Sequence, residues 1–411
     1  MDNNTMNTST EELLREINDE KAISMIPVMV CLCVLMIMGL LGNSMVCFYY
    51  GYKTRRTTNS IFICTVAIYD LISCSLSIPI ELVDLRFFYV FTDSGACKFL
   101  RFINHFAAIG SAFTLLVIAI DRYRRICSPF KKQFTIRDAK IACVLLMLGS
   151  IFFSWPAFVL YSPVEVALVS KQGTEITGTD CTTIRNDAYK PYVWLYNGVH
   201  MLGFIVSVAV LCVMYCLVGR VLLKHKLTRQ KYTRSQPSND NTNSQTSAQT
   251  TVSDNSDVSG DNDRDKFPSV ENVSEDVTKT NGIKLVNMNP AGSVADINSV
   301  RKQQSDQFDI KTVKYTIIML VITIVFVVSF LPYLILVIWR AVIGGHEENV
   351  LSDAGLIAFQ FGIRSYFLNA AINPLTYGFF NSKFRLFFYK VFCPCCHRKS
   401  EKSISFSSGT A

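Results

Sequence analysis

Two groups of charged residues lie within or at the end of long apolar runs of this sequence. Asp70 interrupts the run 59–85, and the triplet Asp121-Arg122-Tyr123 ends the next such run. A carboxylate surrounded by hydrocarbon is unfavourable unless it finds hydrogen-bond donors, a cation or an opposite charge. Asp70 therefore predicts either a buried hydrogen-bond network or a cation site. Asp121 predicts a local ion pair with Arg122.

Other polar side chains occur in apolar runs at depths similar to that of Asp70. Amide and hydroxyl groups are the donors and acceptors that a buried carboxylate needs. The residues that could supply them are Asn43, Ser111, Asn369 and Asn373. We expect these side chains to face Asp70 in the interior of a helical bundle.

Two prolines lie inside apolar runs that are long enough to be helices. Pro332 and Pro374 each remove one backbone hydrogen-bond donor. Because a helix bends most easily where a hydrogen bond is missing, each proline predicts a kink that could act as a pivot.

Seven apolar runs are each long enough to cross a bilayer as a helix. Hydrophobic residues make up 50% of the 411 residues and charged residues only 18%, a composition typical of membrane proteins. About 20 helical residues cross roughly 30 Å of hydrocarbon. The predicted fold is an all-α membrane protein, a seven-transmembrane helix bundle followed by a short amphipathic helix. The runs cover 22–52, 59–85, 102–120, 141–164, 191–219, 315–339 and 354–382.

The basic residues that flank these runs predict the orientation of the bundle. Basic flanks mark the cytoplasmic side of a membrane protein. We therefore expect a multi-pass protein of the plasma membrane with an extracellular amino terminus and a cytoplasmic carboxyl terminus. The net charge of +8 is explained by these flanks, and nucleic-acid binding is not expected. The flanking residues include Lys53, Arg55, Arg56, Arg122, Arg124, Arg125, Lys131, Lys132, Arg220, Lys224, Lys226, Lys383, Arg385 and Lys390.

The runs divide the chain into five regions. These are an extracellular tail (1–21), spans one to five (22–224), a disordered third intracellular loop (225–310), spans six and seven (311–380), and an amphipathic helix with a cytoplasmic tail (381–411). The loop is rich in Ser, Thr, Asn and Asp and has few large apolar residues, so it cannot bury enough surface to fold. Its hydroxyls are candidates for phosphorylation, although an insertion without a regulatory role fits its middle portion equally well.

Three further features predict processing and modification. Asn3 and Asn7 each begin a glycosylation acceptor pattern. No short apolar segment with a cleavage site precedes the first span, so we expect that span itself to direct insertion. The cysteines after the amphipathic helix favour S-acylation, although together with His397 they could also be metal ligands. They are Cys393, Cys395 and Cys396.

A set of short motifs is distributed over the apolar runs. The motifs are Gly42-Asn43, Ala67-Ile-Tyr-Asp70, Cys97 with Asp121-Arg122-Tyr123, Phe204 with Tyr215, Phe326 with Phe330-Leu-Pro332, and Asn373-Pro374-Leu-Thr-Tyr377. Each alone is a weak signal. Their joint occurrence, each in the appropriate run, resembles the rhodopsin-like (class A) family of G-protein-coupled receptors. The general pattern is similar to the neuropeptide-receptor branch of that family.

The resemblance implies two sites within the bundle. One is a sodium and water pocket formed by Asn43, Asp70, Ser111, Asn369 and Asn373, with an allosteric sodium ion at Asp70 as the only metal and no other cofactor. The other is a switch that couples to a G protein when the sixth span moves and frees Arg122. The switch residues are Asp121, Arg122, Tyr123, Tyr215, Phe326, Phe330, Pro332, Asn373, Pro374 and Tyr377.

This sequence departs from the family pattern at several positions. The start of span six reads Lys311-Thr312-Val-Lys314 and lacks the acid that often pairs with the arginine, so we predict a weaker inactive-state clamp and some ligand-independent signalling. Ala370 stands where many relatives have a serine. The remaining departures are Phe330 in place of a tryptophan, Ser207 in place of a proline, and Trp155 as the one candidate for the span-four tryptophan.

Two cysteines outside the spans are expected to face the extracellular side. Cys97 lies at the outer end of span three and Cys181 lies in the long second outer loop. Because that compartment is oxidising, we expect them to form a disulfide bond. The bond would hold the loop across the mouth of the bundle.

The outer half of the bundle offers a mixture of charged, polar and aromatic side chains to a ligand. Asn104 stands where amine receptors have an aspartate, and residues 354–382 contain no lysine that could bind retinal. Charges spread around a wide rim favour an extended polar ligand such as a peptide, although each residue alone also fits a solvated or packing role. The pocket candidates are Glu81, Arg101, Asn104, His105, His200, Phe204, Tyr333, Arg340, Phe359 and Gln360, with Arg364, Glu347 and Glu348 as further charges.

The predicted function is that of a G-protein-coupled receptor for an extracellular ligand, a neuropeptide in the first instance. Its partners would be that peptide, a heterotrimeric G protein, receptor kinases and arrestin. The alternatives are a class A receptor for a small molecule and a transporter or channel, for which internal repeats and more midplane charge are expected. The sequence has no His-Glu-x-x-His motif, phosphate-binding glycine loop or nucleophile elbow, so an enzyme is not expected.

Overall fold

The computed structural model describes residues 3–169, 173–234, 294–343 and 350–392. It contains two units, one formed by 1–226 with 309–411 and the other by 227–308. In the second unit the described residues, 227–234 and 294–308, are helical. The segment 225–310, for which we predicted disorder, therefore begins and ends as helix, because the flanking helices continue beyond their apolar stretches. Its remainder, 235–293, lies outside the described residues.

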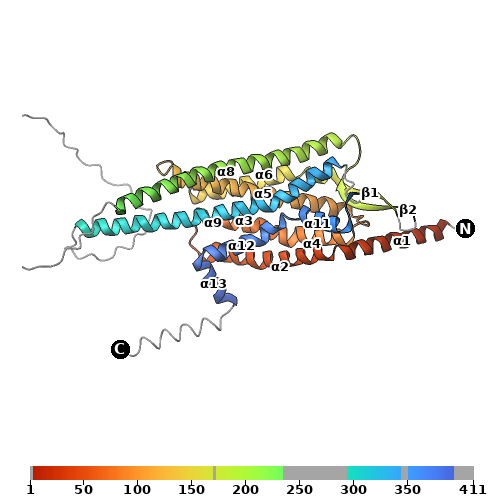
Figure 1. The fold of residues 1–411 in the computed structure, drawn as a ribbon, viewed down its shortest axis with the longest axis horizontal. Helices are drawn as coiled ribbons and strands as arrows, with labels where there is room; N and C mark the ends of the chain where they lie inside the picture. The colour runs from red at the N-terminus through yellow and green to blue at the C-terminus, as the bar shows by residue number, and fades with distance from the viewer. Residues whose placement is uncertain (1–2, 170–172, 235–293, 344–349, 393–411) are drawn as a thin grey trace, which may run out of the picture. The chain divides into compact units, whose positions relative to one another are not determined.

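Long apolar helices make up most of the first unit (Figure 1). Six of the described helical stretches are long and apolar enough to cross a membrane. They comprise α2 (Ile26–Phe48) with a π-helical turn (Tyr49–Lys53); α3 (Thr58–Ile72), a second π-helical turn (Ser73–Ser77) and α4 (Ile78–Arg86); α5 (Ser94–Cys127); α6 (Ile136–Ser154) with α7 (Ala157–Leu160); the part Lys190–Lys224 of α8 (Lys190–Arg234); and the part Val313–Arg340 of α9 (Val294–Val342). The seventh expected run forms α11 (Asp353–Ile363) and α12 (Phe367–Phe380), followed by α13 (Ser382–Phe392).

Polar side chains fix the starts of several of these helices. Thr57 accepts a hydrogen bond from the Ser60 amide at the start of α3, and the Ser60 hydroxyl accepts one from the Thr57 amide in return. Thr135 and Asp138 form the same reciprocal pair before α6, and Asp93 caps α5. These residues satisfy amides that have no partner within a helix, so each start is set by the local sequence.

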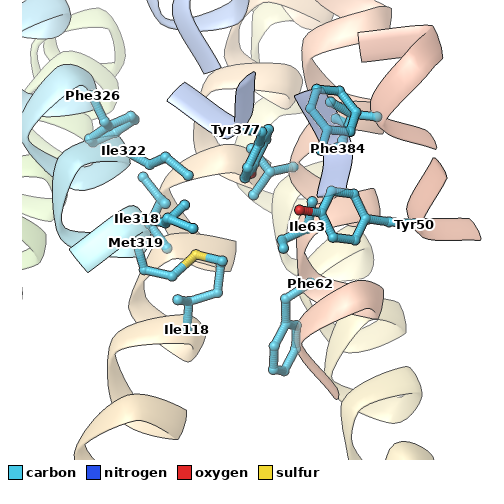
Figure 2. Packing of buried hydrophobic residues seen from close by; sticks show 14 of the residues in the cluster. Tyr50, Phe62, Ile63, Ile118, Ile318, Met319, Ile322, Phe326, Tyr377 and Phe384 are labelled. Carbon is cyan, nitrogen blue, oxygen red and sulfur yellow. The ribbon is translucent and has the colours of Figure 1, made fainter. Parts of the chain in front are cut away.

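Aromatic and aliphatic side chains pack between helices at the end of the unit that contains Asp121 (Figure 2). Tyr377 of α12 lies next to Tyr50, with ring centroids 5.9 Å apart. Asn381 donates a hydrogen bond of 2.7 Å to the Tyr50 hydroxyl, just before α13 begins. On the other side of this core, Ile318 of α9 belongs to the same cluster as Ile118 of α5. The core therefore joins α2, α5, α9 and α12.

Gly42 explains how α2 and α12 can pack closely. A Cβ atom at Gly42 would lie 2.6 Å from Cβ of Pro374, which is closer than two carbon atoms can approach. Asn43, the next residue, donates a hydrogen bond of 2.8 Å to the backbone carbonyl of Ala370. The Gly-Asn pair thus joins these two helices directly.

A two-stranded antiparallel sheet lies between α7 and α8 in the chain and adds a hairpin to the predicted helix bundle. Strand β1 (Tyr161–Val169) pairs with β2 (Glu175–Thr183), and Tyr161 lies opposite Thr183. The fourth run was predicted to extend to 164, but its helix ends at Leu160. Pro163 and the β-branched residues of both strands favour extended backbone over helix here.

The amino-terminal region forms a helix, α1 (Asn3–Ser24), rather than only a polar tail. Its Asn18 side chain donates to the Arg86 carbonyl at 3.2 Å and accepts from the Tyr89 amide at 3.1 Å. Three apolar residues of α1 pack against Tyr89, Leu168 and Ile176, and these are Leu13, Leu14 and Ile17. Their spacing of three and four residues places them on one face, a signal that the acidic composition of the segment obscures.

Candidate functional site

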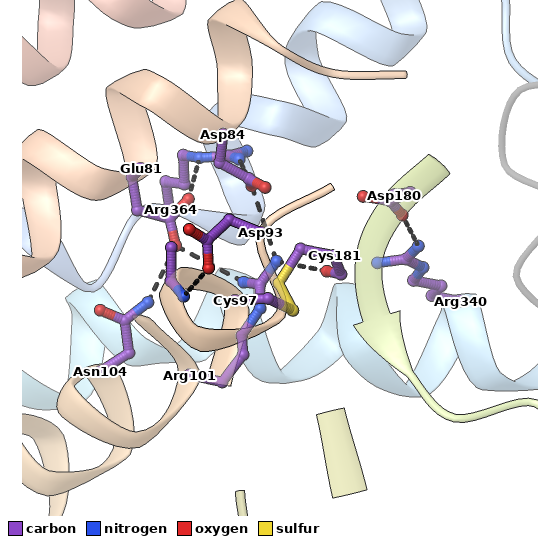
Figure 3. The surroundings of a disulfide bond; sticks show 11 residues. Glu81, Asp84, Asp93, Cys97, Arg101, Asn104, Asp180, Cys181, Arg340 and Arg364 are labelled. Atoms are coloured by element: carbon purple, nitrogen blue, oxygen red, sulfur yellow. Dashed lines mark hydrogen bonds and ion pairs between the residues drawn. A yellow bond between two sulfur atoms is a disulfide. The ribbon is translucent and has the colours of Figure 1, made fainter. Parts of the chain in front are cut away.

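A buried carboxylate, Glu81, forms the centre of a polar site at the end of the unit that contains Cys97 (Figure 3). Its Oε2 accepts a hydrogen bond of 2.9 Å from Nε of Arg364, and its Oε1 accepts one of 2.8 Å from Nδ2 of Asn104. Nη1 of Arg101 lies 3.5 Å from Oε1. The Glu81 side chain is only 2% exposed, so these partners must replace the water that it has lost.

Asp84 is a second buried carboxylate in the same site. Its Oδ2 lies 3.6 Å from Nη2 of Arg101 and 3.5 Å from Nη2 of Arg364. Glu81, Asp84, Arg101 and Arg364 form what we call the outer ionic cluster, in which two negative and two positive charges cancel. Asp84 was not among the residues predicted from the sequence. Its spacing of three residues from Glu81, which places both on one helical face, could have revealed it.

The outer ionic cluster also contacts the disulfide-bonded hairpin. Cys97 of α5 and Cys181 of β2 are bonded, with Cα atoms 5.5 Å apart, which confirms the predicted pair. Nη2 of Arg101 donates a hydrogen bond of 2.8 Å to the carbonyl of Cys181. Next to Cys181, Asp180 lies 3.9 Å from Nη2 of Arg340 on α9. The hairpin is therefore joined to both α5 and α9 (Figure 3).

The other predicted ligand-pocket residues lie in different surroundings. Gln360 accepts a hydrogen bond from Arg364 and so extends the outer ionic cluster. His105 and His200 lie next to each other, with ring centroids 5.1 Å apart. Glu347 and Glu348 lie outside the described residues. The three aromatic candidates pack against other rings, with centroid distances of 6.0 Å for Phe204–Phe326, 5.3 Å for Tyr333–Tyr366 and 5.7 Å for Phe359–Trp339.

Asp70 borders a small cavity in the middle of the bundle. Nδ2 of Asn373 donates a hydrogen bond of 2.8 Å to Oδ2 of Asp70. Ser111 and Asn369 also line the cavity. The space that the centre of a water molecule can occupy there is about 10 Å³, which suits one water molecule or one ion. Oδ1 of Asn369 is buried and receives no hydrogen bond from the described residues. The cavity therefore offers oxygen atoms of the kind that bind a hard cation.

Asn43 is the exception among the predicted pocket residues. Its Nδ2 donates to the carbonyls of Gly39 and Ala370, at 3.0 and 2.8 Å. It does not line the cavity next to Asp70. Asn43 therefore joins α2 to α12, and four of the five predicted residues lie at or next to the cavity.

At the opposite end of the unit, Arg122 is buried and held by two acceptors. It donates hydrogen bonds to Asp121, its neighbour in α5, and to Asn59 of α3. Asp121 also accepts from Nε of Arg125, at 2.9 and 3.0 Å for its two oxygens. We call Asn59, Asp121, Arg122 and Arg125 the inner ionic group. The pairing of Asp121 with Arg122 was expected, whereas Asn59 was missed because nothing in its own segment marks it.

The remaining predicted switch residues lie on several helices between the inner ionic group and the outer half of the bundle, and Tyr215 lies close enough to Arg122 to interact with its charge. The Tyr215 hydroxyl accepts a hydrogen bond of 3.3 Å from Thr323, which joins α8 to α9. Tyr123 is half-buried, and Phe326 and Phe330 pack at 4.5 Å between centroids. Pro332 and Pro374 each lie inside a helix, as their sequence positions indicated.

The start of the sixth span offers no acid to Arg122 among the residues whose side chains are described. Lys314 is exposed there, and the side chains of Lys311 and Thr312 are not described. Among the described residues, Asn59 on α3 supplies the contact that joins Arg122 to another helix.

Comparison with known proteins agrees with this architecture. The model of the 7 transmembrane receptor (rhodopsin family) matches residues 42–377. The match includes both ends of the bundle, from the Gly42-Asn43 pair to Tyr377, and the chain belongs to this family. It is therefore a multi-pass membrane protein with a receptor fold, and the expectation that it is not an enzyme is confirmed by the family.

Individual relatives are more distant. The chain is 27% identical over 197 residues to the C3a anaphylatoxin chemotactic receptor of Danio rerio, which covers 47% of this chain and 52% of the relative. It is 25% identical over 202 residues to the growth hormone secretagogue receptor type 1 of Homo sapiens, with the same coverage. It is 32% identical over 120 residues to neuropeptide receptor 18 of Caenorhabditis elegans, covering 29% of this chain and 24% of the relative. The chain thus matches about half the length of the first two relatives.

Proposed function

We propose that this chain is a G-protein-coupled receptor of the plasma membrane whose extracellular ligand is a peptide. The observation that supports this most is the outer ionic cluster, in which carboxylates and guanidinium groups meet next to Cys181. A peptide carries charged termini and side chains of both signs. Each of its charges can therefore replace a carboxylate or guanidinium group as the partner of a residue in the cluster. The named peptide system among the relatives, the neuropeptide receptor of Caenorhabditis elegans, supports the same class of ligand.

Arg101 is the point at which we expect the ligand to enter the cluster. Its side chain is 23% exposed, whereas those of Glu81, Asp84 and Arg364 are each below 10% exposed. A guanidinium group pairs well with a carboxylate because it can donate two parallel hydrogen bonds. A carboxylate of the peptide, at a side chain or at the terminus, would therefore bind Arg101.

A library screen tests this proposal. Cells that express the chain would be exposed to peptides and to amines while calcium and cyclic AMP are recorded. We expect a peptide to activate the receptor, and Arg101→Gln to raise the half-maximal concentration at least about tenfold, because a buried charged contact is worth about 2 kcal/mol or more. Asp187→Asn, at an exposed residue paired only with Lys190, is the matched control. An unchanged response of Arg101→Gln, or activation by amines alone, would favour the small-molecule alternative.

The same proposal places Asp121 and Arg122 on the cytoplasmic side. In the resting receptor Arg122 is held by Asp121 and Asn59. Outward movement of the sixth helix, α9, would open the space in which Arg122 turns away from both acceptors and contacts the G protein. Receptor kinases and arrestin would then act on the cytoplasmic tail. Epitope tags at Met1 and Ala411 must be accessible from opposite sides of intact cells, and access from one side contradicts the orientation.

We propose a sodium ion for the cavity next to Asp70. Asp70, Ser111 and Asn369 would hold it, and the ion would supply the positive charge that this buried carboxylate lacks. Sodium chloride should then raise the unfolding temperature of the purified receptor more than N-methylglucamine chloride does, and Asp70→Asn should remove the difference. Equal effects of the two salts on the wild type would exclude the ion.

The proposed modifications fit the same orientation. Asn3 and Asn7 would carry glycans, and their backbone lies in α1, although their side chains are not described. The acylation candidates Cys393, Cys395 and Cys396 lie outside the described residues. Glycosidase treatment and hydroxylamine-sensitive palmitate labelling of the expressed protein test these two predictions.

A further inference from the structure

His105 of α5 and His200 of α8 lie side by side in the interior of the bundle, and His105 is one helical turn from Arg101 of the outer ionic cluster. Their ring centroids are 5.1 Å apart, with the ring planes at 72°. Tyr196, one turn before His200, completes the group, with its ring 4.2 Å from His200 and 5.3 Å from His105. We infer that His105 and His200, with Tyr196, form a binding site for a divalent transition-metal ion such as Zn²⁺.

Both imidazole rings are held in the form that binds a metal. Nδ1 of His105 lies 2.7 Å from the Arg101 carbonyl, and Nδ1 of His200 lies 2.8 Å from the Tyr196 carbonyl. A carbonyl can only accept a hydrogen bond, so each Nδ1 must carry the proton and each Nε2 must present a lone pair. A backbone carbonyl bound to the second ring nitrogen is also the usual partner of a metal-binding histidine.

Two of the three atoms that would face the metal lack hydrogen-bond partners among the described residues. Nε2 of His200 and the hydroxyl of Tyr196 are buried and form no hydrogen bond with any described residue. The Phe153 carbonyl lies beside His200 without forming a hydrogen bond to Nε2. Buried polar atoms without partners are unfavourable and call for an explanation. A metal ion satisfies two imidazole lone pairs and a phenol oxygen at once.

The separation of the rings fits one ion between them. Zn–N distances of about 2.0–2.1 Å and a tetrahedral angle place the centres of two zinc-bound imidazoles about 5 Å apart. The observed 5.1 Å agrees with this value. Two nitrogen atoms and one oxygen atom leave a fourth position for water, as in zinc sites that exchange a ligand.

The charged group nearest to the site is the guanidinium of Arg101, and acidic neighbours offset most of its effect on a cation. Arg101 is one turn from His105 in α5, but its guanidinium group is directed to Glu81, Asp84 and the Cys181 carbonyl. Its positive charge is therefore compensated within the outer ionic cluster. A bound ion would join α5 to α8 across their interface, and this inference holds whether or not the ligand of the receptor is a peptide.

The test uses the full-length receptor purified in detergent, with its free thiols alkylated so that the cysteines do not bind metal. Zinc chloride is titrated while thermal unfolding is followed, and bound zinc is counted after equilibrium dialysis. We expect the wild type to bind one zinc ion more than the histidine variants do. Zinc should also raise its unfolding temperature by a few degrees, because a ligand that binds only the folded state stabilises it.

Variants decide where the zinc is bound. His105→Gln and His200→Gln can keep the hydrogen bond to the backbone carbonyl but lose the Nε2 lone pair, so both should lose the temperature shift and the bound ion. Tyr196→Phe should weaken binding by a smaller factor. His225→Gln, in the same helix as His200, is the matched control and should keep the full shift. No shift in the wild type, a shift that persists in either imidazole variant, or loss of the shift in the control would each overturn the inference.

Discussion

The two ionic groups of this receptor differ in how many separate elements hold each charge. In the outer ionic cluster, Glu81 and Asp84 of α4 share Arg101 of α5 and Arg364, which lies between α11 and α12. In the inner ionic group, Arg122 is held by its own neighbour Asp121 and by one amide, Asn59. The outer ionic cluster thus links three parts of the bundle through charged side chains. The inner ionic group links two helices through one neutral acceptor, the side chain of Asn59.

This difference indicates different roles for the two ends. Release of Arg122 from α3 breaks one hydrogen bond, and Asp121 stays paired with Arg125 afterwards. Release of Arg364 leaves two buried carboxylates with too few cations, which is much less favourable. If the chain has the proposed function, the inner ionic group can therefore change partners during signalling. The outer cluster should change only when a charged ligand replaces what it loses.

The largest effect is expected from Arg364→Ala. The change leaves Glu81 and Asp84 with Arg101 as their one guanidinium partner, and loss of one member of a buried pair typically costs about 3–5 kcal/mol of unfolding free energy. The measurement is thermal unfolding and surface expression of the receptor. Glu165→Ala, at an exposed strand position, is the control and should change stability by no more than about 0.5 kcal/mol.

A double variant sharpens the same prediction. Glu81→Gln together with Arg364→Gln removes one charge of each sign, so it should be less destabilising than the sum of the two single changes. Strict additivity would show that these two side chains do not interact. The outer cluster would then not differ from the inner group in the way described above.

A smaller effect, on signalling rather than folding, is expected from Asn59→Ala. A hydrogen bond to a charged group is worth about 1.5–3 kcal/mol, so its loss should raise the population in which Arg122 is free by roughly tenfold or more. Basal second-messenger levels should rise while expression stays near that of the wild type. Asn186→Ala, in an exposed loop, is the control. A basal level equal to that of the wild type would contradict the role given to Asn59.

The smallest effect is expected from Arg125→Ala. The side chain of Arg125 is 29% exposed, and its pair with Asp121 is therefore partly screened by water. Without it, Asp121 has Arg122 as its one cationic partner within the group, so basal signalling should fall by less than about twofold. A basal level that rises as far as in Asn59→Ala would mean that Arg125, and not Asn59, restrains Arg122.

The inner group was largely predictable from sequence because its main contact is local. Asp121 and Arg122 are adjacent, and the charge-free run before them indicates that they lie at a helix end. Asn59 could not be found, since its contact with Arg122 depends on how α3 packs against α5. The prediction of a weaker clamp from the missing acid at the start of span six stays a prediction.

The outer cluster was predictable only as separate residues. Glu81, Arg101 and Arg364 were each selected as rim charges, but the pair between Glu81 and Arg364 joins residues 283 positions apart, and no periodicity reports such a contact. For each of these residues the sequence left a solvated rim charge and a packing role open, whereas the structure buries Glu81 and Arg364 and leaves Arg101 partly exposed. The hairpin and α1 were also missed because their contacts join distant parts of the chain. The apolar side chains of α1 pack against those of the hairpin and not against lipid.

The proposed role of Arg122 is tested most directly by nucleotide exchange on a purified heterotrimeric G protein with the receptor in lipid nanodiscs. Exchange without ligand should be faster with Asn59→Ala than with the wild type, and Arg122→Ala should give no more exchange than empty nanodiscs. Equal exchange by all three proteins would contradict the claim that a partly restrained Arg122 couples this receptor to its G protein.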